Sequence, residues 1–255
     1  MVLLAVDAGN SNLTVGVFEG DRLAAHGRFA THRDATPDEL GGQLLQLLAH
    51  RGIAPDFRQV AISCVVPPLN QPLREASREY FHREPLLIGP ATVTGMRVNY
   101  DPPRDVGADR IATAVGVRHR YGAPAIMVSF GTATVFDAID QDGGYLGGAI
   151  APGLQMSVDA LFARAARLPR VDLVAPPRVL GTNTVSSMQA GIMFGAAAQA
   201  EGLLRRIRAE LGTPARVVAT GGLSELVGPM VEGVDVIDPL VLLEGLRVLA
   251  ELNPQ

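Results

Sequence analysis

The chain has 255 residues, 47% of them hydrophobic, and a formal net charge of −4 at pH 7. This charge argues against nucleic acids and anionic membranes as partners, because both bind basic surfaces. The single cysteine, Cys64, excludes a disulfide framework and a cysteine metal site, and no apolar run approaches the roughly 18 to 20 residues that span a bilayer, so we expect a cytoplasmic protein.

The opening stretch is typical of a buried strand that ends on polar side chains. Apolar residues 2–6 precede Asp7, and Gly9 is followed by the short polar residues 10–12. Glycine lets a ligand approach the backbone, and N–H groups and short polar side chains donate to phosphate oxygens. Asp7 would then face a cation bound to the phosphate. The alternative is an ordinary hairpin turn, because Asp, Asn, Ser and Gly all favour turns.

The first half of the chain predicts three antiparallel strands, a helix, a strand, a second helix and a short strand, which together give a mixed sheet with helices packed against it. These elements are expected at residues 2–6, 13–18, 22–31, 36–52, 59–66, 67–80 and 85–89. The first helix is well marked, because Thr36 and Glu39 fit a capping box and Pro37 suits the first helical position.

A charged, proline-rich segment, residues 99–110, leads into an apolar helix at residues 111–121. In one interpretation Asp109 is the N-cap of this helix and Arg110 lies in its solvated first turn. In the other, a carboxylate beside a guanidinium holds a hydroxylated substrate and accepts its proton. The local pattern alone favours the N-cap.

The second half repeats the opening pattern. A buried strand at residues 124–130 runs into a small-residue turn, and strands at residues 135–139 and 145–150 follow. Aligning Gly9 with Gly131 places Asp7 on Ser129, so the chain looks duplicated. This pattern resembles the superfamily of actin, heat-shock chaperones and sugar kinases, in which two such units grip the phosphates of ATP. The paired glycines of Thr220–Leu223 resemble the adenosine-contacting segment of that superfamily.

Three further helices are expected in the second half, at residues 155–167, 184–211 and 239–252. In the first of them we expect Val158, Leu161 and Phe162 to face the core. Gly191 and Gly195 lie four residues apart in the second, a spacing that permits close helix approach. The neighbour is either the chain's own sheet or another subunit.

Seven stretches, in order and spacing, resemble the type III pantothenate kinases, and the match spans nearly the whole chain. They are Asp7–Asn12, Gly107–Arg110, Gly131–Thr134, Gly147–Gly153, Leu168–Pro169, Met188–Gly191 and Thr220–Leu223. The resemblance implies an α/β fold of the duplicated actin-like (ribonuclease H-like) ATPase type. Two mixed-sheet domains, residues 1–122 and 123–255, would flank a nucleotide cleft.

The same resemblance implies ATP-dependent phosphorylation of pantothenate to 4'-phosphopantothenate, the first step of coenzyme A biosynthesis, in a homodimer. It assigns Asp109 as proton acceptor, which outweighs the N-cap interpretation. The implied ATP-binding residues are Asp7, Ala8, Gly9, Asn10, Ser11, Asn12, Leu13, Thr14 and Thr132. The implied pantothenate-binding residues are Tyr100, Gly107, Ala108, Asp109, Arg110 and, from the partner subunit, Thr184. Magnesium is expected with ATP, with Asp7 facing it through water.

Two positions depart from the family's pattern: Ser129 and Val135 stand where aspartate and threonine are usual. In the family that aspartate is associated with a monovalent cation, potassium or ammonium, near the phosphates. Serine keeps an oxygen ligand but loses the charge. We prefer an adjusted cation site in a working kinase over reduced activity. The competing function is a non-catalytic nucleotide-binding regulator of the same family, and a sugar or acetate kinase is disfavoured by Gly107–Arg110.

Overall fold

The computed structural model describes residues 2–165 and 167–254, which form two compact units. One unit comprises Met1–His119 and Val241–Gln255, and the other comprises Arg120–Leu240. Residues 1, 166 and 255 lie outside the described part, and with them the outer ends of the two predicted domains and one position of the helix predicted at residues 155–167.

The first unit is built on a five-stranded sheet with the order β3-β2-β1-β4-β5. The first three strands form the predicted antiparallel meander, and β4 and β5 extend it in parallel. Its elements are β1 (Val2–Ala8), β2 (Asn12–Glu19), β3 (Arg22–Ala30), α1 (Pro37–His50), β4 (Gln59–Cys64), α2 (Asn70–Phe81), β5 (Leu86–Leu87), α3 (Ala108–Tyr121, whose last two residues belong to the second unit) and α7 (Val241–Leu252). Short 3-10 helices lie at Pro67–Leu69 and Pro103–Asp105.

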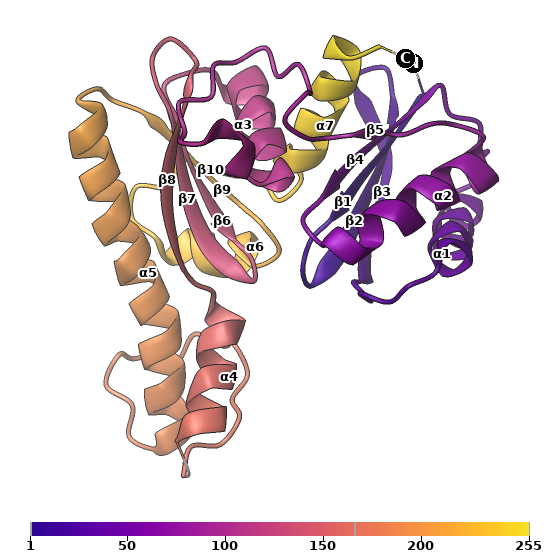
Figure 1. Ribbon diagram of the computed structural model, residues 1–255. Coiled ribbons are helices and arrows are strands. Elements are labelled where there is room, and N and C mark those ends of the chain that lie inside the picture. The colour runs from indigo at the N-terminus through magenta and orange to yellow at the C-terminus, as the bar shows by residue number, and fades with distance from the viewer. Residues whose placement is uncertain (1, 166, 255) are drawn as a thin grey trace. The chain divides into compact units, whose positions relative to one another are not determined.

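Helices α1 and α2 lie together on one face of this sheet (Figure 1). Leu44 of α1 and Leu73 of α2 are buried in one core with Val6 and Val15 of the sheet. The predicted capping box of α1 is confirmed, because Glu39 N–H donates to Thr36 Oγ1 and Thr36 N–H donates to Glu39 Oε2. The other face of β1 is covered as well, because Leu3 and Ala5 are as fully buried as Leu4 and Val6.

The second unit repeats this arrangement with the strand order β10-β9-β6-β7-β8. Its elements are β6 (Ala125–Phe130), β7 (Ala133–Ile139), β8 (Tyr145–Pro152), α4 (Leu154–Arg164), α5 (Thr184–Leu211), β9 (Arg216–Thr220), α6 (Ser224–Val227), a 3-10 helix (Gly228–Met230) and β10 (Val236–Ile237). In both units an antiparallel meander is extended by two parallel strands. The duplication predicted from the two glycine turns is thus present in the topology.

Helix α5 has the bounds predicted for it, and α4 packs beside its N-terminal part, beyond the end of the sheet (Figure 1). Val158 of α4 is buried as expected, but Leu161 and Phe162 are 38% and 52% exposed, so the prediction that they face the core is wrong. Because α4 extends beyond the sheet, only one face of it is covered within the unit.

Helix α7 packs against β1 and β4 of the first unit, which differs from the division expected at residues 122 and 123. Its Leu243, Leu246 and Leu249 are buried, because this apolar stripe covers the sheet face opposite to α1 and α2. Where α7 crosses α3, a Cβ on Gly245 would overlap Ala112 O, and a Cβ on Gly116 would overlap Val241 O. Two glycines thus let the helix backbones touch.

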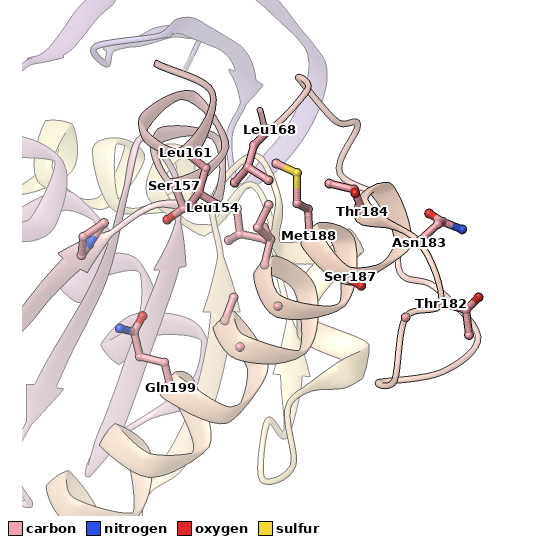
Figure 2. Close-up of a pocket in the computed structure, with 16 residues that line it drawn as sticks. Leu154, Ser157, Leu161, Leu168, Thr182, Asn183, Thr184, Ser187, Met188 and Gln199 are labelled. Carbon is pink, nitrogen blue, oxygen red and sulfur yellow. The ribbon is translucent and has the colours of Figure 1, made fainter. Parts of the chain in front are cut away.

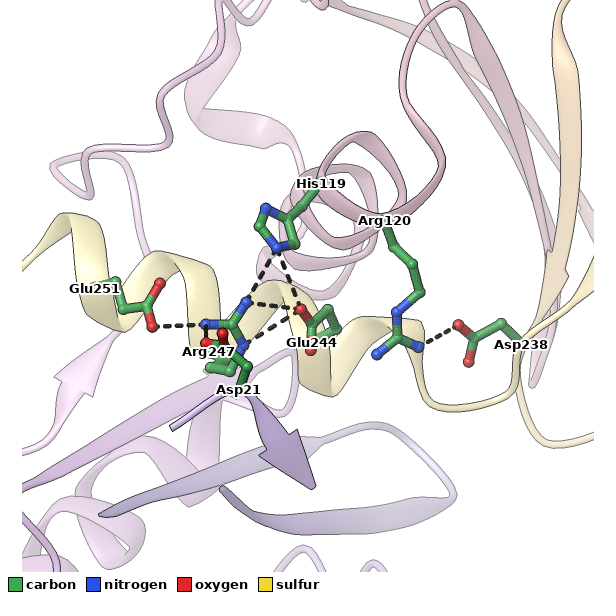
Figure 3. Close-up of polar contacts among 7 residues, drawn as sticks. All are labelled: Asp21, His119, Arg120, Asp238, Glu244, Arg247 and Glu251. Atoms are coloured by element: carbon green, nitrogen blue, oxygen red, sulfur yellow. Dashed lines mark hydrogen bonds and ion pairs between the residues drawn. The ribbon is translucent and has the colours of Figure 1, made fainter. Parts of the chain in front are cut away.

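A buried arginine fixes the polar side of α7. Arg247, with only 3% of its side chain exposed, donates to Glu244 Oε1 at 2.8 Å, Asp21 Oδ1 at 2.9 Å and Glu251 Oε1 at 2.6 Å, and lies 3.1 Å from His119 Nε2 (Figure 3). These bonds join α7 to the β2–β3 turn and to α3. In the second unit, a separate ion pair joins Arg120 to Asp238 at 2.7 Å.

Among the described residues, no helix is both long and apolar enough to cross a membrane.

Candidate functional site

The first turn lies at the end of β1, where polar groups are buried without partners. Strand register places Asp7 beside Thr14 on β2 and Ser63 on β4. Asp7 Oδ1 and Ser63 Oγ are buried and have no hydrogen-bond partner among the described residues. A Cβ on Gly9 would lie 3.2 Å from Asn12 O and 4.0 Å from Asp7 Oδ2, so the tight contact that glycine avoids is with the backbone of the turn. Buried polar groups without partners are rare in native proteins and point to an absent ligand or ion.

The environment of Asp7 raises its pKa to about 7 from an ordinary value of 3.8. Burial is the main cause, because it disfavours the charged form, and the negative charge of Asp109 is the second. The neighbouring Ser63 lowers the pKa in part. Asp7 and Asp109, assigned separately from the sequence, are therefore brought close together within the first unit.

The other residues expected to bind ATP around the first turn differ in how exposed their side chains are. Asn10, Ser11 and Asn12 are exposed, whereas the side chains of Ala8 and Leu13 are buried in the core. Only the backbone of Ala8 and Leu13 is thus available for the ATP contact expected of them.

Asp109 lies in the first turn of α3 but is not its N-cap. The helix begins at Ala108, and Ile111 N–H donates to Gly107 O at 3.1 Å, so Gly107 is the capping residue. The N-cap interpretation of Asp109 is wrong, because the helix starts earlier than the apolar pattern indicates. Asp109 Oδ1 accepts from Arg110 N–H at 2.8 Å, and a Cβ on Gly107 would lie 2.5 Å from the same oxygen. Glycine at position 107 therefore makes room for the Asp109 carboxylate.

Arg110 and Tyr100 are also brought together. The Arg110 guanidinium carbon lies 5.6 Å from the centroid of the Tyr100 ring, within the range of a cation–π contact. Both residues are half-buried. The first unit thus places Tyr100 beside Arg110, and it brings Asp7 under the electrostatic influence of Asp109, which lies far from it in the sequence.

The second turn has the same position in its sheet but different chemistry. Gly131 N–H donates to Ala133 O at 3.0 Å, and Thr132 between them is exposed. Ser129, the counterpart of Asp7, has Val135 and Thr220 as its register partners. Neither partner is acidic, so strand pairing brings no carboxylate to this position.

Of the paired glycines after β9, the structure explains why the first, Gly221, must be glycine. Gly221 has φ +91°, and a Cβ there would lie 2.7 Å from Phe130 O. Leu223 N–H donates to the same carbonyl at 3.0 Å. The glycine therefore lets this segment pack against the second turn.

Thr184 lies at the first position of α5, beside a pocket of about 960 Å³ between α4, α5 and the preceding loop. Asn183 caps the helix by accepting from Ser186 N–H at 2.9 Å. Figure 2 shows Leu154, Leu168 and Met188 pointing into this pocket, with Thr184 at its rim. Thr184 is exposed and belongs to the second unit, whereas Asp109 belongs to the first.

Two residues beside the first turn were not predicted from the sequence. Thr31 Oγ1 donates to Gly9 O at 2.7 Å, and Arg33 donates to Asn10 Oδ1 at 3.3 Å. Both could have been inferred from the predicted meander. In a meander the end of the third antiparallel strand lies beside the turn that joins the first two strands, so residues just after the third strand lie near that turn.

Among the described residues, no group of three or more His, Cys, Asp or Glu side chains could hold a metal ion by itself. A metal that binds with a phosphate ligand needs only one or two carboxylates from the protein. The unpartnered Asp7 Oδ1 fits such a site.

Comparisons with known proteins find one family over most of the chain. The family model of type III pantothenate kinase matches residues 3–206. A type III pantothenate kinase of Moorella thermoacetica is 52% identical over 253 residues, which cover 99% of this chain and 100% of the relative. That of Geobacillus kaustophilus is 46% identical over 255 residues, which cover 100% of this chain and 99% of the relative.

Solved structures show the same fold at low identity. The activator of 2-hydroxyisocaproyl-CoA dehydratase from Clostridium difficile, with bound ADPNP, has a TM-score of 0.60 and 13% identity, covering 99% of this chain and 96% of its own. A ROK hexokinase from Thermus thermophilus has a TM-score of 0.54 and 14% identity, covering 99% and 98%. The predicted duplicated actin-like ATPase fold is confirmed. On the family model and these full-length identities, the chain belongs to the type III pantothenate kinase family.

Proposed function

We propose that the chain transfers the γ-phosphoryl group of ATP to the primary hydroxyl of pantothenate, giving 4'-phosphopantothenate for coenzyme A biosynthesis, in the cytoplasm where ATP is available. The observation that carries the proposal is the buried, unpartnered Asp7 Oδ1 at the first turn, together with the charge of Asp109, which raises the pKa of Asp7. One carboxylate would serve the nucleotide and the other the acceptor alcohol.

Asp109 is the proton acceptor in this proposal. Phosphoryl transfer does not require the protein to form covalent bonds with the substrates. A carboxylate beside the substrate hydroxyl and groups that hold the phosphates are therefore sufficient for catalysis. The bond from Arg110 N–H holds one Asp109 oxygen at 2.8 Å, and Gly107 leaves room for it. An oriented carboxylate accepts the hydroxyl proton as the new phosphate ester bond forms and the bond from the γ-phosphorus to the leaving ADP breaks.

The pantothenate site is assigned to Tyr100, Gly107, Ala108, Asp109 and Arg110. Pantothenate carries a carboxylate, which a guanidinium binds in a bidentate manner. The Tyr100 ring beside Arg110 limits the positions of that guanidinium. The ATP phosphates are assigned to residues 7–14 and to Thr132 of the second turn.

Magnesium bound with ATP would neutralise phosphate charge. Asp7 would hold it through water, because the unpartnered Oδ1 lies at the end of β1 beside Gly9. Protonated Asp7 would not serve this purpose, so binding of the ion and loss of the Asp7 proton are coupled.

A monovalent cation fits the second turn less well. Ser129 provides a hydroxyl, and its register partners Val135 and Thr220 add no negative charge. The residues present do not fit a site in which potassium or ammonium is held by a carboxylate, and the assigned mechanism uses neither ion.

We also propose a homodimer in which Thr184 reaches the partner subunit's pantothenate site. The support is an uncovered apolar surface around α4 and α5. Leu161, Phe162 and Val185 are 38%, 52% and 44% exposed, and Leu180 is 85% exposed. Large apolar side chains gathered in one region of a protein mark an interaction surface.

The test is ADP release coupled to phosphopantothenate formation, with Asp109→Asn as the inactive control. The competing function, a non-catalytic nucleotide-binding regulator, is favoured by Ser129 alone. ATP binding without turnover at any potassium or ammonium concentration would support the regulator and contradict our proposal. A panel of sugars and acetate as acceptors tests the third function, which predicts turnover with one of them and none with pantothenate.

A further inference from the structure

The first turn is held from behind by Thr31, the residue that follows β3. Thr31 N–H donates to Ser11 O at 3.0 Å, and Thr31 Oγ1 donates to Gly9 O at 2.7 Å. Thr31 is half-buried, so both bonds are partly shielded from water. One residue thus occupies two carbonyl oxygens of a turn that contains only residues 9–11 between its strands.

These bonds matter because a phosphate is repelled by carbonyl oxygens and attracted by N–H groups. With Gly9 O and Ser11 O bound to Thr31, two negative dipole ends of the turn are directed toward β3. Gly9 N–H is used by Asn12 O at 3.0 Å, whereas Asn10 N–H has no acceptor among the described residues. The arrangement leaves Asn10 N–H available for an anion.

Arg33 adds positive charge to the same turn. Its guanidinium donates to Asn10 Oδ1 at 3.3 Å, and both side chains are exposed. The carbonyl oxygen of the Asn10 amide is thereby occupied, and its NH₂ group remains as a donor.

The second unit has a contact at the corresponding place. Gly153 follows β8 as Thr31 follows β3, and a Cβ on Gly153 would overlap Gly131 O and Thr132 O. The backbone of Gly153 therefore packs against two carbonyls of the second turn. In both units the residue after the third strand covers the turn's carbonyl oxygens, by hydrogen bonds in the first and by close packing in the second.

We propose that Thr31 is a positioning residue for the phosphates of ATP, which it serves by turning the carbonyl oxygens of Gly9 and Ser11 away from them. The inference rests on the proposed function, because it takes the first turn as the phosphate site. Thr31 itself does not touch the nucleotide. The role of Thr31 is separate from that of Asp109, so an experiment can contradict this inference without contradicting the proposed function, and the reverse.

The test compares Thr31→Val, Thr31→Ser and wild type by calorimetric ATP binding without pantothenate and by steady-state kinetics. Valine has the shape of threonine but cannot donate to Gly9 O. We expect Thr31→Val to weaken ATP binding about ten-fold, as one lost, oriented hydrogen bond and one freed carbonyl imply. The KM for pantothenate should stay within about two-fold, and Thr31→Ser, which keeps the hydroxyl, should restore ATP binding.

Thr94→Val is the matched control, because Thr94 Oγ1 donates to Met96 O at 2.8 Å in the same unit and is likewise half-buried. It should leave ATP affinity unchanged. If Thr31→Val fails to fold by circular dichroism, Thr31→Ala replaces it with the same expectation.

Wild-type ATP affinity in folded Thr31→Val, or equal losses for ATP and pantothenate, would overturn the inference. If wild type binds ATP with the expected Thr31 dependence but does not phosphorylate pantothenate, the proposed function fails and the inference stands. If wild type binds no ATP, both fail.

Discussion

The carboxylates of Asp7 and Asp109 lie close enough for the charge of Asp109 to raise the pKa of Asp7. Asp7 is the next-to-last residue of β1 and Asp109 is the second residue of α3, about a hundred residues later, yet both belong to the first unit. Two like charges near one another are costly unless a cation or a proton separates them. Burial and the charge of Asp109 therefore both favour the protonated form of Asp7 in the protein without a bound cation.

The first prediction concerns Asp7 and pH. Its folded-state pKa of about 7 exceeds the ordinary value of 3.8, so the native state binds more protons than the unfolded state between these pH values. The Asp7 carboxyl therefore lowers stability as pH rises through this window. Asp7→Asn should be more stable than wild type at pH 8, by on the order of 2 to 4 kcal/mol, and similar to it at pH 4.

Urea denaturation of the chelator-treated protein across pH measures this effect. Asp56→Asn is the control, because Asp56 is exposed and lies outside the site. An Asp7→Asn variant less stable than wild type at pH 8 would contradict the prediction. It would mean that interactions in the free protein stabilise the charged Asp7 carboxylate. ATP binding with magnesium should be weakened in the same variant.

The second prediction concerns Asp109. Asp109→Asn keeps an oxygen that accepts from Arg110 N–H but cannot take a proton, so turnover should fall by roughly 10² to 10⁴. Stability should change little. The substitution also removes the charge that raises the pKa of Asp7, which should therefore titrate at lower pH in the variant. Near-normal turnover would leave Asp109 with only a structural role in the first turn of α3.

The third prediction concerns Thr184 in a dimer. Mixing equal amounts of inactive Asp109→Asn and Thr184→Val subunits should restore activity if each site combines Asp109 of one subunit with Thr184 of the other. Half of the dimers would be mixed and each would hold one intact site, so about a quarter of wild-type activity is expected. Assay after denaturation and joint refolding measures it. No recovery, with sedimentation showing mixed dimers, would mean that Thr184 acts within its own subunit or not at all.

The fourth prediction concerns Ser129. Wild type should show no saturable activation by potassium, whereas Ser129→Asp restores a carboxylate and should raise potassium affinity roughly ten- to thirty-fold. ATP affinity by calorimetry in potassium chloride, against tetramethylammonium chloride at matched ionic strength, provides a readout apart from turnover. Superimposable curves for the two proteins would mean that any cation effect does not depend on position 129.

The fifth prediction concerns Arg247. Arg247→Met leaves Glu244, which is 5% exposed, as a buried charge without its main partner, and should cost about 3 to 5 kcal/mol of unfolding free energy. Adding Glu244→Leu to Arg247→Met should restore much of the lost unfolding free energy, because the buried carboxylate that has lost its partner is then removed as well. Glu251→Gln is the milder control, since the Glu251 side chain is 46% exposed. Denaturant unfolding of wild type, Arg247→Met, Glu244→Leu, the double variant and Glu251→Gln measures the coupling. Additive losses in the double variant would contradict it.

The sequence predicted the parts of the fold that depend on local patterns. The capping box of α1 and the bounds of α5 follow from residues adjacent in the chain. The Asp7 turn was proposed as a phosphate site from its own residues, whereas Asp109 was proposed as proton acceptor through the family resemblance, since the local pattern there indicated an N-cap.

What the sequence did not reveal depends on contacts between distant residues. The bonds of Thr31 to Gly9 and Ser11 require the register of the meander, and those of Arg247 to Asp21 and His119 require α7 to return to the first sheet. The outward position of Phe162 likewise could not be inferred, because an apolar stripe does not say whether its partner lies in the same chain.

The return of α7 to the first unit has a consequence for biosynthesis on the ribosome. Domains usually fold in the order in which they emerge, but the buried face of β1 and β4 is not covered until residues 241–252 have been made. The whole of Arg120–Leu240 emerges before then and is contiguous, so the second unit can finish folding first. Until translation reaches α7, nascent chains carry an exposed apolar sheet face, and this interval is when they most need chaperone protection.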